Sequence, residues 1–147
     1  MANDFDTVVA ARLESDGQRY TENRRELVEL LASGGAPLTI PEVLKARPDL
    51  AQSSVYRNLS ILERAGVVHR IVTNDEWARY ELAEEFGEHH HHLICSTCGS
   101  VQDFTVPTAL ERAIDAASHA VADGAGFVLA HHNLDLIGRC AACVSES

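Results

Sequence analysis

The sequence predicts an α+β protein, in which a winged helix-turn-helix module is followed by a small α/β module. Apolar residues recur with helical spacing through the first 65 residues and are followed at once by two short β-prone runs. Four consecutive histidines, His89 to His92, stand two residues ahead of a Cys-x-x-Cys pair, and a second such pair lies near the C-terminus. The first half holds nearly all of the basic residues, which indicates two modules with different partners.

Two amphipathic helices are expected at the start of the chain. The first covers residues 5–14 and ends at Gly17. The second follows Thr21 and stops at Gly34. Its apolar residues are Leu27, Val28, Leu30 and Leu31.

A shorter pair of helices and a hairpin complete the first module. The segment Thr39-Ile-Pro-Glu42 fits a capping box, and the helix that it starts must stop before Pro48. Serines cap a further helix over residues 53–65, and Gly66 stands where a left-handed C-cap is expected. Residues 67–72 and 78–82 then read as two strands joined by a turn at 73–76. This order is typical of a winged helix-turn-helix.

Tyr56 and Arg57 lie near the start of the helix over 53–65, on the face opposite its apolar stripe. In an isolated helix they would be a half-buried tyrosine and a solvated arginine. Directly before a wing they occupy the place from which a recognition helix reaches base edges and phosphates. We therefore expect both to contact DNA.

The second module is expected to be strand, knuckle, strand, helix and strand. The strands are predicted at 93–95, 101–104 and 127–137, and the helix between Pro107 and Gly124. Residues 84–88 are polar and acidic and read as a linker. The predicted organisation is therefore a winged-helix DNA-binding domain over 1–83, a linker over 84–88 and a metal-binding domain over 89–147.

Composition narrows the class of protein. The net charge is −10, but residues 1–80 hold 10 Lys/Arg and 12 Asp/Glu, whereas residues 81–147 hold 2 and 10. The second half is therefore suited to cations.

No apolar run is long enough for a membrane span, and the N-terminus lacks the pattern of a signal peptide, so we expect a cytoplasmic protein without a membrane partner. No HExxH, phosphate-binding loop or G-x-S-x-G motif is present. We expect no enzyme and no small-molecule substrate.

The four cysteines carry the strongest signal for a metal site. Two Cys-x-x-Cys turns can supply four thiolates to a tetrahedral zinc ion, which is a closed structural site. A redox dithiol usually stands alone at the start of a helix within a βαβ pattern, and neither pair has that setting. We therefore expect structural zinc. The ligands would be Cys95, Cys98, Cys140 and Cys143.

The histidine run indicates further metal sites. Side chains alternate between the two faces of an extended segment, so His89 and His91 would point one way and His90 and His92 the other. One segment could then serve two sites. Additional candidates, whose simpler reading is solvated surface, are His69, Glu81, Glu111, His131 and His132, and we keep the simpler reading for His131.

Together these features resemble the ferric uptake regulator (Fur) superfamily of metal-responsive repressors, over essentially the whole chain. The matching segments are Ser54-Val-Tyr-Arg57, Tyr80-Glu-Leu82, the histidines with Leu-Ile-Cys-x-x-Cys-Gly99, and His132 eight residues before Cys140-x-x-Cys143. The histidine block is the most specific of them.

The resemblance implies a homodimer that represses transcription by binding a palindromic operator in double-stranded DNA, with a C-terminal α/β dimerisation domain. It implies structural zinc on the four cysteines and DNA contacts by Arg19, Tyr56 and Arg57. The implied regulatory site is formed by His90, His92, Glu81 and a ligand from the first domain. An additional site would use His89, His91, Glu111 and His132.

Two departures from the family pattern affect the regulatory site. Pro37 stands where many members carry the histidine ligand of the first domain, and His69 is the best substitute. The segment from Cys98 to Glu111 is one residue longer than usual, which makes Glu111 a weaker candidate than His132.

The identity of the regulatory metal is less determined than the family. The unbroken histidine run most resembles the zinc uptake regulator branch, which predicts a zinc-responsive repressor of metal uptake genes. Because the regulatory ligands are nitrogen and oxygen, Fe²⁺, Mn²⁺ and Ni²⁺ are also accepted, so iron-responsive, peroxide-sensing and nickel-responsive regulators stay open as alternatives. A metal-buffering protein and a thiol redox protein are the alternatives from other classes.

Overall fold

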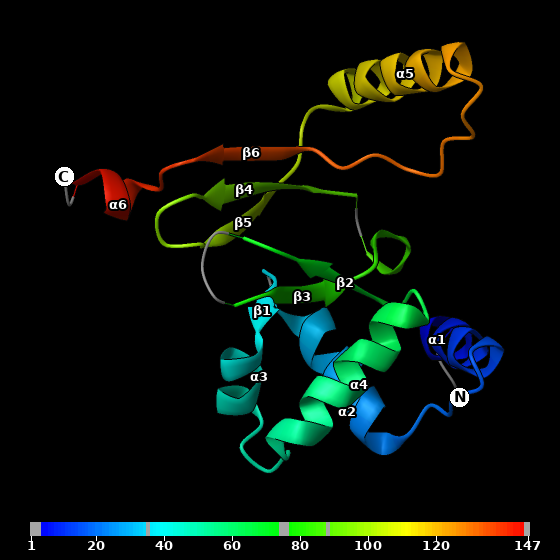
Figure 1. Ribbon diagram of the computed structural model, residues 1–147, viewed down its shortest axis with the longest axis vertical. Helices are drawn as coiled ribbons and strands as arrows, with labels where there is room; N and C mark the ends of the chain where they lie inside the picture. The colour runs from blue at the N-terminus through cyan, green and yellow to red at the C-terminus, as the bar shows by residue number, and fades with distance from the viewer. Residues whose placement is uncertain (1–3, 35, 74–76, 88, 146–147) are drawn as a thin grey trace.

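The computed structural model describes residues 4–34, 36–73, 77–87 and 89–145, and it has the predicted α+β architecture of two modules (Figure 1). The winged-helix module contains α1 (Asp4–Ser15), α2 (Glu22–Ser33), β1 (Leu38–Thr39), α3 (Ile40–Ala46), α4 (Gln52–Arg64), β2 (Val68–Ile71) and β3 (Arg79–Leu82). A 3-10 helix, η1 (Glu84–Phe86), leads into the second module. That module contains β4 (His91–Cys95), β5 (Val101–Phe104), α5 (Thr108–Gly124), β6 (Asp135–Gly138) and α6 (Ala141–Ser145).

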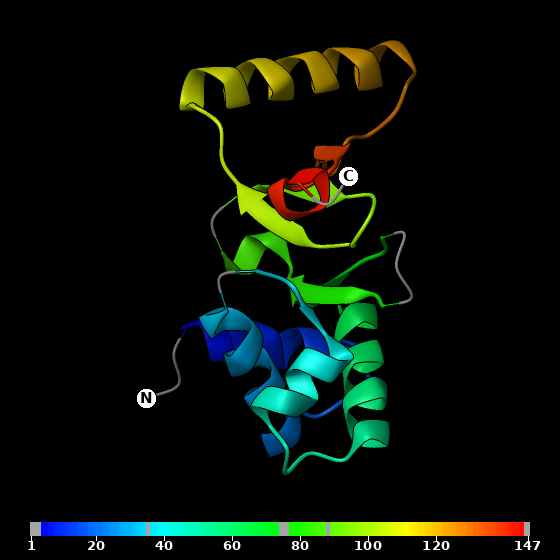
Figure 2. The same ribbon diagram turned by 90° about the vertical axis from the view of Figure 1, so that its left-hand side faces the viewer.

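The main core lies among the first four helices and the wing. Each helix contributes the residues that its apolar periodicity predicts, such as Leu13 of α1, Leu27 of α2, Val43 of α3 and Leu59 of α4, all fully buried or within 1% of it. Figure 2 shows these helices gathered below the small β1-β3-β2 sheet. The core therefore packs α4 against β2, which pairs with β3, the strand that leads to the second module.

Local signals set the helix ends. Thr39 accepts from the Glu42 amide at 3.2 Å while the Glu42 carboxylate accepts from the Thr39 amide, which confirms the capping box. Gly66 has φ +78, the left-handed conformation expected after α4. The serine cap of α4 was a wrong prediction, because Ala51 occupies the N-cap without a side-chain bond.

The wing is shorter than the sequence suggested, and it pairs β2 with β3 in antiparallel register, with His69 opposite Glu81. Residues 74–76 of the predicted turn lie outside the described part of the chain. The two-residue β1 adds a third strand by pairing Leu38 with Tyr80. A strand so short has no periodicity to predict it.

In the second module β4 is central, with β5 antiparallel on one side and β6 parallel on the other. The register sets His92 between Asp103 of β5 and Asp135 of β6. The predicted strand over 127–137 is wrong in length, because only β6 at its end finds a partner strand. Phe127 and Val128 are exposed, and neither pairs with a strand of the described chain.

The helix α5 lies at the end of the molecule farthest from the winged-helix module (Figure 1). Of its described residues only Ala122 is buried, although the helix has a marked apolar side. Leu110 and Val121 on that side are 49% and 75% exposed. No helix in the described ranges is long and apolar enough to cross a membrane.

Candidate metal centres

The four cysteines form one group, here called the cysteine cluster. Cys95 and Cys140 stand at the ends of β4 and β6, which run parallel with Cys95 opposite Gly138, so both Cys-x-x-Cys turns meet at one edge of the sheet. The four sulfur atoms lie within 4.8 Å of one another, and Cys98 Sγ is 3.8 Å from Cys140 Sγ. Four sulfurs at about 2.3 Å from a tetrahedral zinc ion stand about 3.8 Å apart. The cluster therefore fits zinc.

Backbone amides donate hydrogen bonds to the cysteine cluster and favour the thiolate form of Cys95. The amides of Cys98 and Cys140 donate to Cys95 Sγ at 3.5 and 3.4 Å and lower the pKa of the Cys95 thiol to about 5. Contact with Cys140, together with burial, raises the pKa of the Cys143 thiol to about 12. All four cysteines are free rather than disulfide-bonded. Such a site gathers negative charge that a divalent cation would neutralise.

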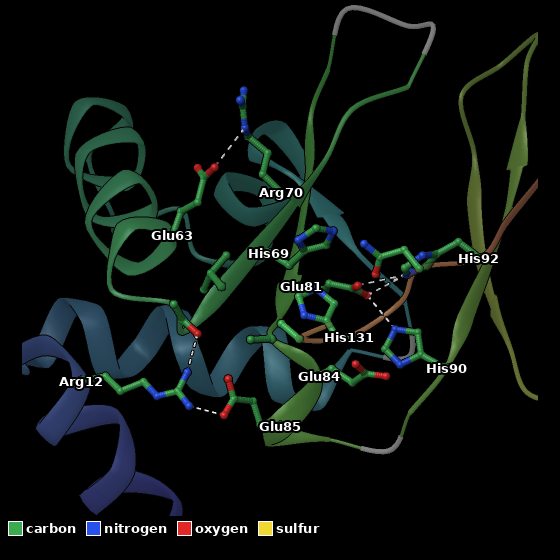
Figure 3. Close-up of a pocket in the computed structure, with 15 residues that line it drawn as sticks. Arg12, Glu63, His69, Arg70, Glu81, Glu84, Glu85, His90, His92 and His131 are labelled. Atoms are coloured by element: carbon green, nitrogen blue, oxygen red, sulfur yellow. Dashed lines mark hydrogen bonds and ion pairs between the residues drawn. The ribbon is translucent and has the colours of Figure 1, made fainter. Parts of the chain in front are cut away.

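A second group, the interdomain cluster, joins the two modules. It consists of Glu81, His90, His92 and Asp103, whose ligating atoms also lie within 4.8 Å of one another. Glu81 comes from β3 of the winged-helix module, and Figure 3 shows its carboxylate between the two imidazoles. Nε2 of His90 and Nε2 of His92 each lie 3.0 Å from a Glu81 oxygen. The nearest Asp103 oxygens are 3.8 and 3.7 Å from the same nitrogens.

The other ring nitrogen of His92 is held from outside the cluster. Its Nδ1 lies 3.3 Å from Asp135 Oδ1, which leaves Nε2 facing Glu81 and Asp103. A metal-binding histidine commonly has its second nitrogen bonded to a carboxylate in this way. The same register that pairs β4 with β6 therefore orients this imidazole.

The carboxylates and imidazoles of the interdomain cluster shift one another's pKa. Burial would raise the pKa of Glu81, but the hydrogen bonds with His92 and His90 outweigh it and leave that pKa below its usual range. Burial would lower the pKa of His92, but Glu81 and Asp135 raise it overall. Burial raises the pKa of Asp103. In the absence of a cation, protons therefore supply the positive charge that holds these groups together.

A third group, the Glu111 cluster, lies on the opposite face of the histidine segment and consists of His89, His91, Glu111 and His132. Glu111 is at its centre, with Nε2 of His89, His91 and His132 at 2.7, 2.7 and 2.9 Å from its oxygens. The extra residue before Glu111 does not remove this carboxylate from the site. The alternating histidines thus face two separate clusters.

Two buried atoms that face the histidine clusters make ion-pair contacts but no hydrogen bond among the described residues. They are Asp103 Oδ1, 3.7 Å from His92 Nε2, and His89 Nε2, 2.7 Å from Glu111 Oε1. Buried polar atoms are rarely left without a hydrogen bond. A divalent cation in each cluster would satisfy them.

His69 is not among the side chains that the interdomain cluster brings together. It lies directly across the hairpin from Glu81, but its side chain is exposed and lines the wall of a cavity of about 770 Å³ between the modules (Figure 3). Asp103 occupies the remaining side of the cluster instead. Asp103 was not among the residues predicted from the sequence, because its place opposite His92 depends on the β4–β5 register. His131 is exposed and lines the same cavity.

The predicted DNA-contacting side chains are exposed on the winged-helix module. Tyr56 is 43% exposed, and Arg57 and Arg19 are also exposed. Arg24 of α2 adds a cation that was not predicted from the sequence. Its Nε donates to Asn58 Oδ1 of α4 at 3.0 Å. Burial lowers the pKa of the Arg24 guanidinium, and the nearby charge of Arg57 lowers it further. Neither Arg24 nor Arg57 has a carboxylate at ion-pair distance among the described residues.

A winged helix joined through a His/carboxylate cluster to a cysteine-bearing module defines a metal-responsive transcription regulator. Residues 15–137 match the ferric uptake regulator family, and the chain belongs to that family. It is 30% identical over 135 residues to the peroxide operon regulator of Bacillus subtilis, covering 89% of this chain and 88% of that protein. It is 33% identical over 141 residues to the ferric uptake regulation protein of Campylobacter jejuni, covering 91% and 85%.

Solved structures give the same assignment. The ferric uptake regulator of Helicobacter pylori, described with three functional metal-binding sites, superposes with a TM-score of 0.71 at 26% identity over 96% of this chain and 92% of that chain. The manganese-bound ferric uptake regulator of Pseudomonas aeruginosa also gives a TM-score of 0.71 at 26% identity, over 89% of this chain and 96% of that chain. A zinc uptake regulator in complex with zinc and DNA shares the fold at 23% identity, with a TM-score of 0.55 over 99% and 98%. Members of this family are transcription regulators rather than enzymes.

Proposed function

We propose that this chain is a zinc-responsive repressor of metal uptake genes and that the interdomain cluster is its sensor. The observation that carries the proposal is the origin of the ligands: Glu81 comes from the wing, whereas His90, His92 and Asp103 come from the second module. A cation held by all four would bind most tightly at one angle between the modules. The boundaries that go with this are a DNA-binding domain over 1–83, a linker over 84–88 and a metal-binding domain over 89–147.

The donor sets support zinc at more than one site. Four thiolates form a closed structural zinc site. Two imidazoles and two carboxylates in the interdomain cluster number four, which suits tetrahedral zinc, whereas iron and manganese accept more ligands. The Glu111 cluster offers three imidazoles and one carboxylate for an additional cation.

The residues act through geometry and charge. A bound cation would supply positive charge between carboxylates that otherwise repel one another. Glu81 then draws β3 towards β4 and β5, and the rigid winged-helix core carries α4 with it. Tyr56 and Arg57 of α4 would reach base edges and phosphates in the major groove, and Arg19 would lie near a minor groove.

A second copy of the chain completes the proposal. The apolar side of α5 and the outer strand β6 leave Val121, Leu136 and Ile137 75%, 46% and 70% exposed. A helix and a strand of this kind are stable when another surface covers them. A two-fold homodimer would cover both and would set two α4 helices at the spacing of a palindromic operator in double-stranded DNA.

A specific observation also favours a second candidate, an Fe²⁺-dependent regulator that responds to peroxide. The Asp103 carboxylate makes the interdomain cluster richer in oxygen than the sequence predicted, and oxygen ligands suit Fe²⁺. The likeness to the peroxide operon regulator supports this candidate, as the ferric uptake regulators support iron.

Operator binding measured metal by metal would separate these candidates. The protein is titrated onto its own upstream region with Zn²⁺, Fe²⁺, Mn²⁺ or Ni²⁺, and the Fe²⁺ sample is repeated after brief exposure to hydrogen peroxide. We expect Zn²⁺ to give the tightest complex at the lowest free-metal concentration. Tighter binding with Fe²⁺, lost after peroxide treatment, would replace the zinc proposal with the second candidate.

The sensor assignment is tested by His90→Ala with His92→Ala. This double variant should lose metal-dependent operator binding while it keeps its fold and oligomeric state, because the cysteine cluster is untouched. Metal-dependent binding that survives in the variant would show that the sensor lies elsewhere. A metal-buffering protein would show no metal-dependent DNA complex at all, and a thiol redox protein would reduce insulin disulfides.

A further inference from the structure

The linker helix η1 contacts both modules with three consecutive side chains. The Glu84 carboxylate meets Nδ1 of His89, which belongs to the Glu111 cluster. The Glu85 carboxylate forms an ion pair with Arg12 of α1. The Phe86 ring packs edge-on against Phe5 of α1 with 5.4 Å between ring centroids. The linker therefore connects a candidate metal site to the first helix of the chain.

Arg12 joins the other end of this connection. Its Nη2 pairs with Glu85 (Figure 3). Its guanidinium lies 5.0 Å above the Phe86 ring, and its Nη1 donates to the Gly66 carbonyl at 2.9 Å. Gly66 follows Ala65, the C-cap of α4, which is the proposed recognition helix. One arginine thus ties α1, the end of α4 and the linker together.

The His89 ring is divided between the linker and the Glu111 cluster. Its Nδ1 faces Glu84, whereas its Nε2 lies 2.7 Å from Glu111 Oε1. A carboxylate on one ring nitrogen fixes the tautomer that leaves the other nitrogen free to ligate a cation. Glu84 Oε1 is buried and makes no hydrogen bond among the described residues, and His89 Nδ1 is the cationic group at ion-pair distance from it.

We propose that Glu84 is a positioning residue for His89. A divalent cation in the Glu111 cluster then also fixes the linker helix. Through Arg12 and Phe86, it fixes the docking of that helix on the winged-helix module. The inference rests on the proposed occupancy of the Glu111 cluster. Metal binding in the Glu111 cluster would then affect the winged-helix module through the linker, separately from the interdomain cluster. If Glu84 and His89 form only an ion pair, a cation in the cluster leaves the linker unchanged.

Metal affinity tests the positioning role. Variants are built on His90→Ala with His92→Ala, so that the Glu111 cluster is the histidine site that remains, with zinc on the cysteines. Co²⁺ is titrated and followed by its visible absorption. We expect Glu84→Ala to weaken Co²⁺ binding about tenfold or more, and Glu84→Gln, which keeps an acceptor, to recover most of the loss. Glu14→Gln on the exposed face of α1 is the matched control and should bind as the parent does.

Hydrogen exchange tests the connection to the linker. The amides of Phe86 and Gly87 donate to the carbonyls of Ala83 and Glu84 at 2.9 and 3.1 Å, so they report the order of η1. Co²⁺ should slow their exchange in the parent but not in Glu84→Ala. In Glu85→Gln the Co²⁺ affinity should stay within about threefold, because Glu85 lies outside the Glu111 cluster. Co²⁺ should also slow the exchange of α1 amides in the parent, and it should slow them less in Glu85→Gln, because the ion pair to Arg12 is removed.

Three results would overturn the inference. Unchanged Co²⁺ affinity in Glu84→Ala would remove the positioning role. Co²⁺ that binds the parent without slowing linker exchange would remove the coupling, and a parent that binds no Co²⁺ would remove the site itself. No DNA is present in either experiment, so each of these results leaves the repressor proposal to its own operator-binding test.

Discussion

At the scale of single residues, cross-strand pairing decides which side chains share a metal site. His92 stands opposite Asp103, eleven positions later in the chain, and on its other side opposite Asp135. The histidine run could be recognised in the sequence because its members are adjacent. Asp103 could not be assigned without the β4–β5 register, because a shift of one residue would have turned it to the other face.

The choice between Asp103 and His69 can be tested directly. Asp103→Ala should weaken metal binding at the interdomain cluster at least ~10-fold, since it removes one of the four ligand groups. His69→Ala is the matched comparison, and it should change the affinity less than about threefold because its side chain is exposed and outside the cluster. Competition against a chelator of known affinity measures both. The reverse order of effects would restore His69 as the ligand.

Tyr20 predicts a pH dependence of folding. Burial, and next the hydrogen bond to Asp6 at 3.1 Å, raise the pKa of its hydroxyl well above the ordinary value. A group with a raised pKa in the folded state contributes stability below its unfolded pKa of about 10 and loses that contribution as the pH rises further. The free energy of unfolding should therefore fall between about pH 10 and 11.

Tyr20→Phe should flatten this fall, and urea unfolding at each pH measures it. Tyr56→Phe, at an exposed tyrosine, serves as the control and should follow the native protein. A Tyr20→Phe curve that runs parallel to the native one would assign the alkaline loss of stability to another group.

At the scale of elements, long amphipathic helices were predictable and short pieces were not. The burial of Val9 in α1, Val28 in α2 and Leu62 in α4 follows from spacing alone. The strand predicted over 127–137 was too long because an apolar run becomes a strand only where another strand pairs with it. Within this run, β4 pairs with the residues of β6. Two-residue β1, η1 and five-residue α6 depend on tertiary contacts that no local pattern records.

The packing of α2 against the recognition helix leads to a prediction for Arg24. Its hydrogen bond to Asn58 holds α4 in place, and its uncompensated charge lies beside Arg57. Arg24→Ala should weaken operator binding about tenfold and lower the slope of log affinity against log salt by about one. Arg24→Lys should keep the slope but still lose affinity, because it keeps the charge and not the guanidinium geometry.

Fluorescence anisotropy at several salt concentrations measures both quantities. Arg112→Ala, on exposed α5 in the other module, is the charge-matched control and should leave the slope unchanged. An Arg24→Ala variant with native affinity and slope would mean that Arg24 has no part in the DNA interface.

We expect zinc in the cysteine cluster to hold the C-terminal elements onto the sheet. The ends of β4 and β6 and the short α6 meet there, and few of the described apolar side chains around them are buried. Cys95→Ser, or removal of zinc with a strong chelator, should therefore lower the unfolding midpoint of the second module and release α6. The winged-helix module, which has its own core, should keep its transition. Calorimetry that shows a single unchanged transition would argue against structural zinc.

At the scale of the whole molecule, charge and exposed apolar surface are unevenly divided. The chain carries a net charge of −10, yet Arg19, Arg24 and Arg57 gather at the proposed DNA-binding end. The acidic second module surrounds the candidate metal clusters, so cations there would also reduce the repulsion between this protein and phosphate.

The family and the general role could be predicted from the sequence, because the histidine run and each Cys-x-x-Cys motif are contiguous. The exposed faces of α5 and β6 could not.

Those exposed faces give the last prediction, because an outer strand as apolar as β6 invites pairing with another chain. Ile137 is 70% exposed on that strand, beside Leu136. Ile137→Glu should convert the proposed homodimer to a monomer in analytical ultracentrifugation, since it would place a charge in the proposed apolar contact. Val72→Glu, at a similarly exposed position of the wing, should leave the dimer intact. The Ile137→Glu monomer should still bind metal at the interdomain cluster, because one chain supplies all four of its ligand groups. Its affinity for a palindromic operator should fall far more than its affinity for a half-site, because only the dimer holds two α4 helices at the operator spacing. A variant that stays dimeric, or a monomer that prefers the palindrome as strongly as the native protein, would place the contact between copies on another surface.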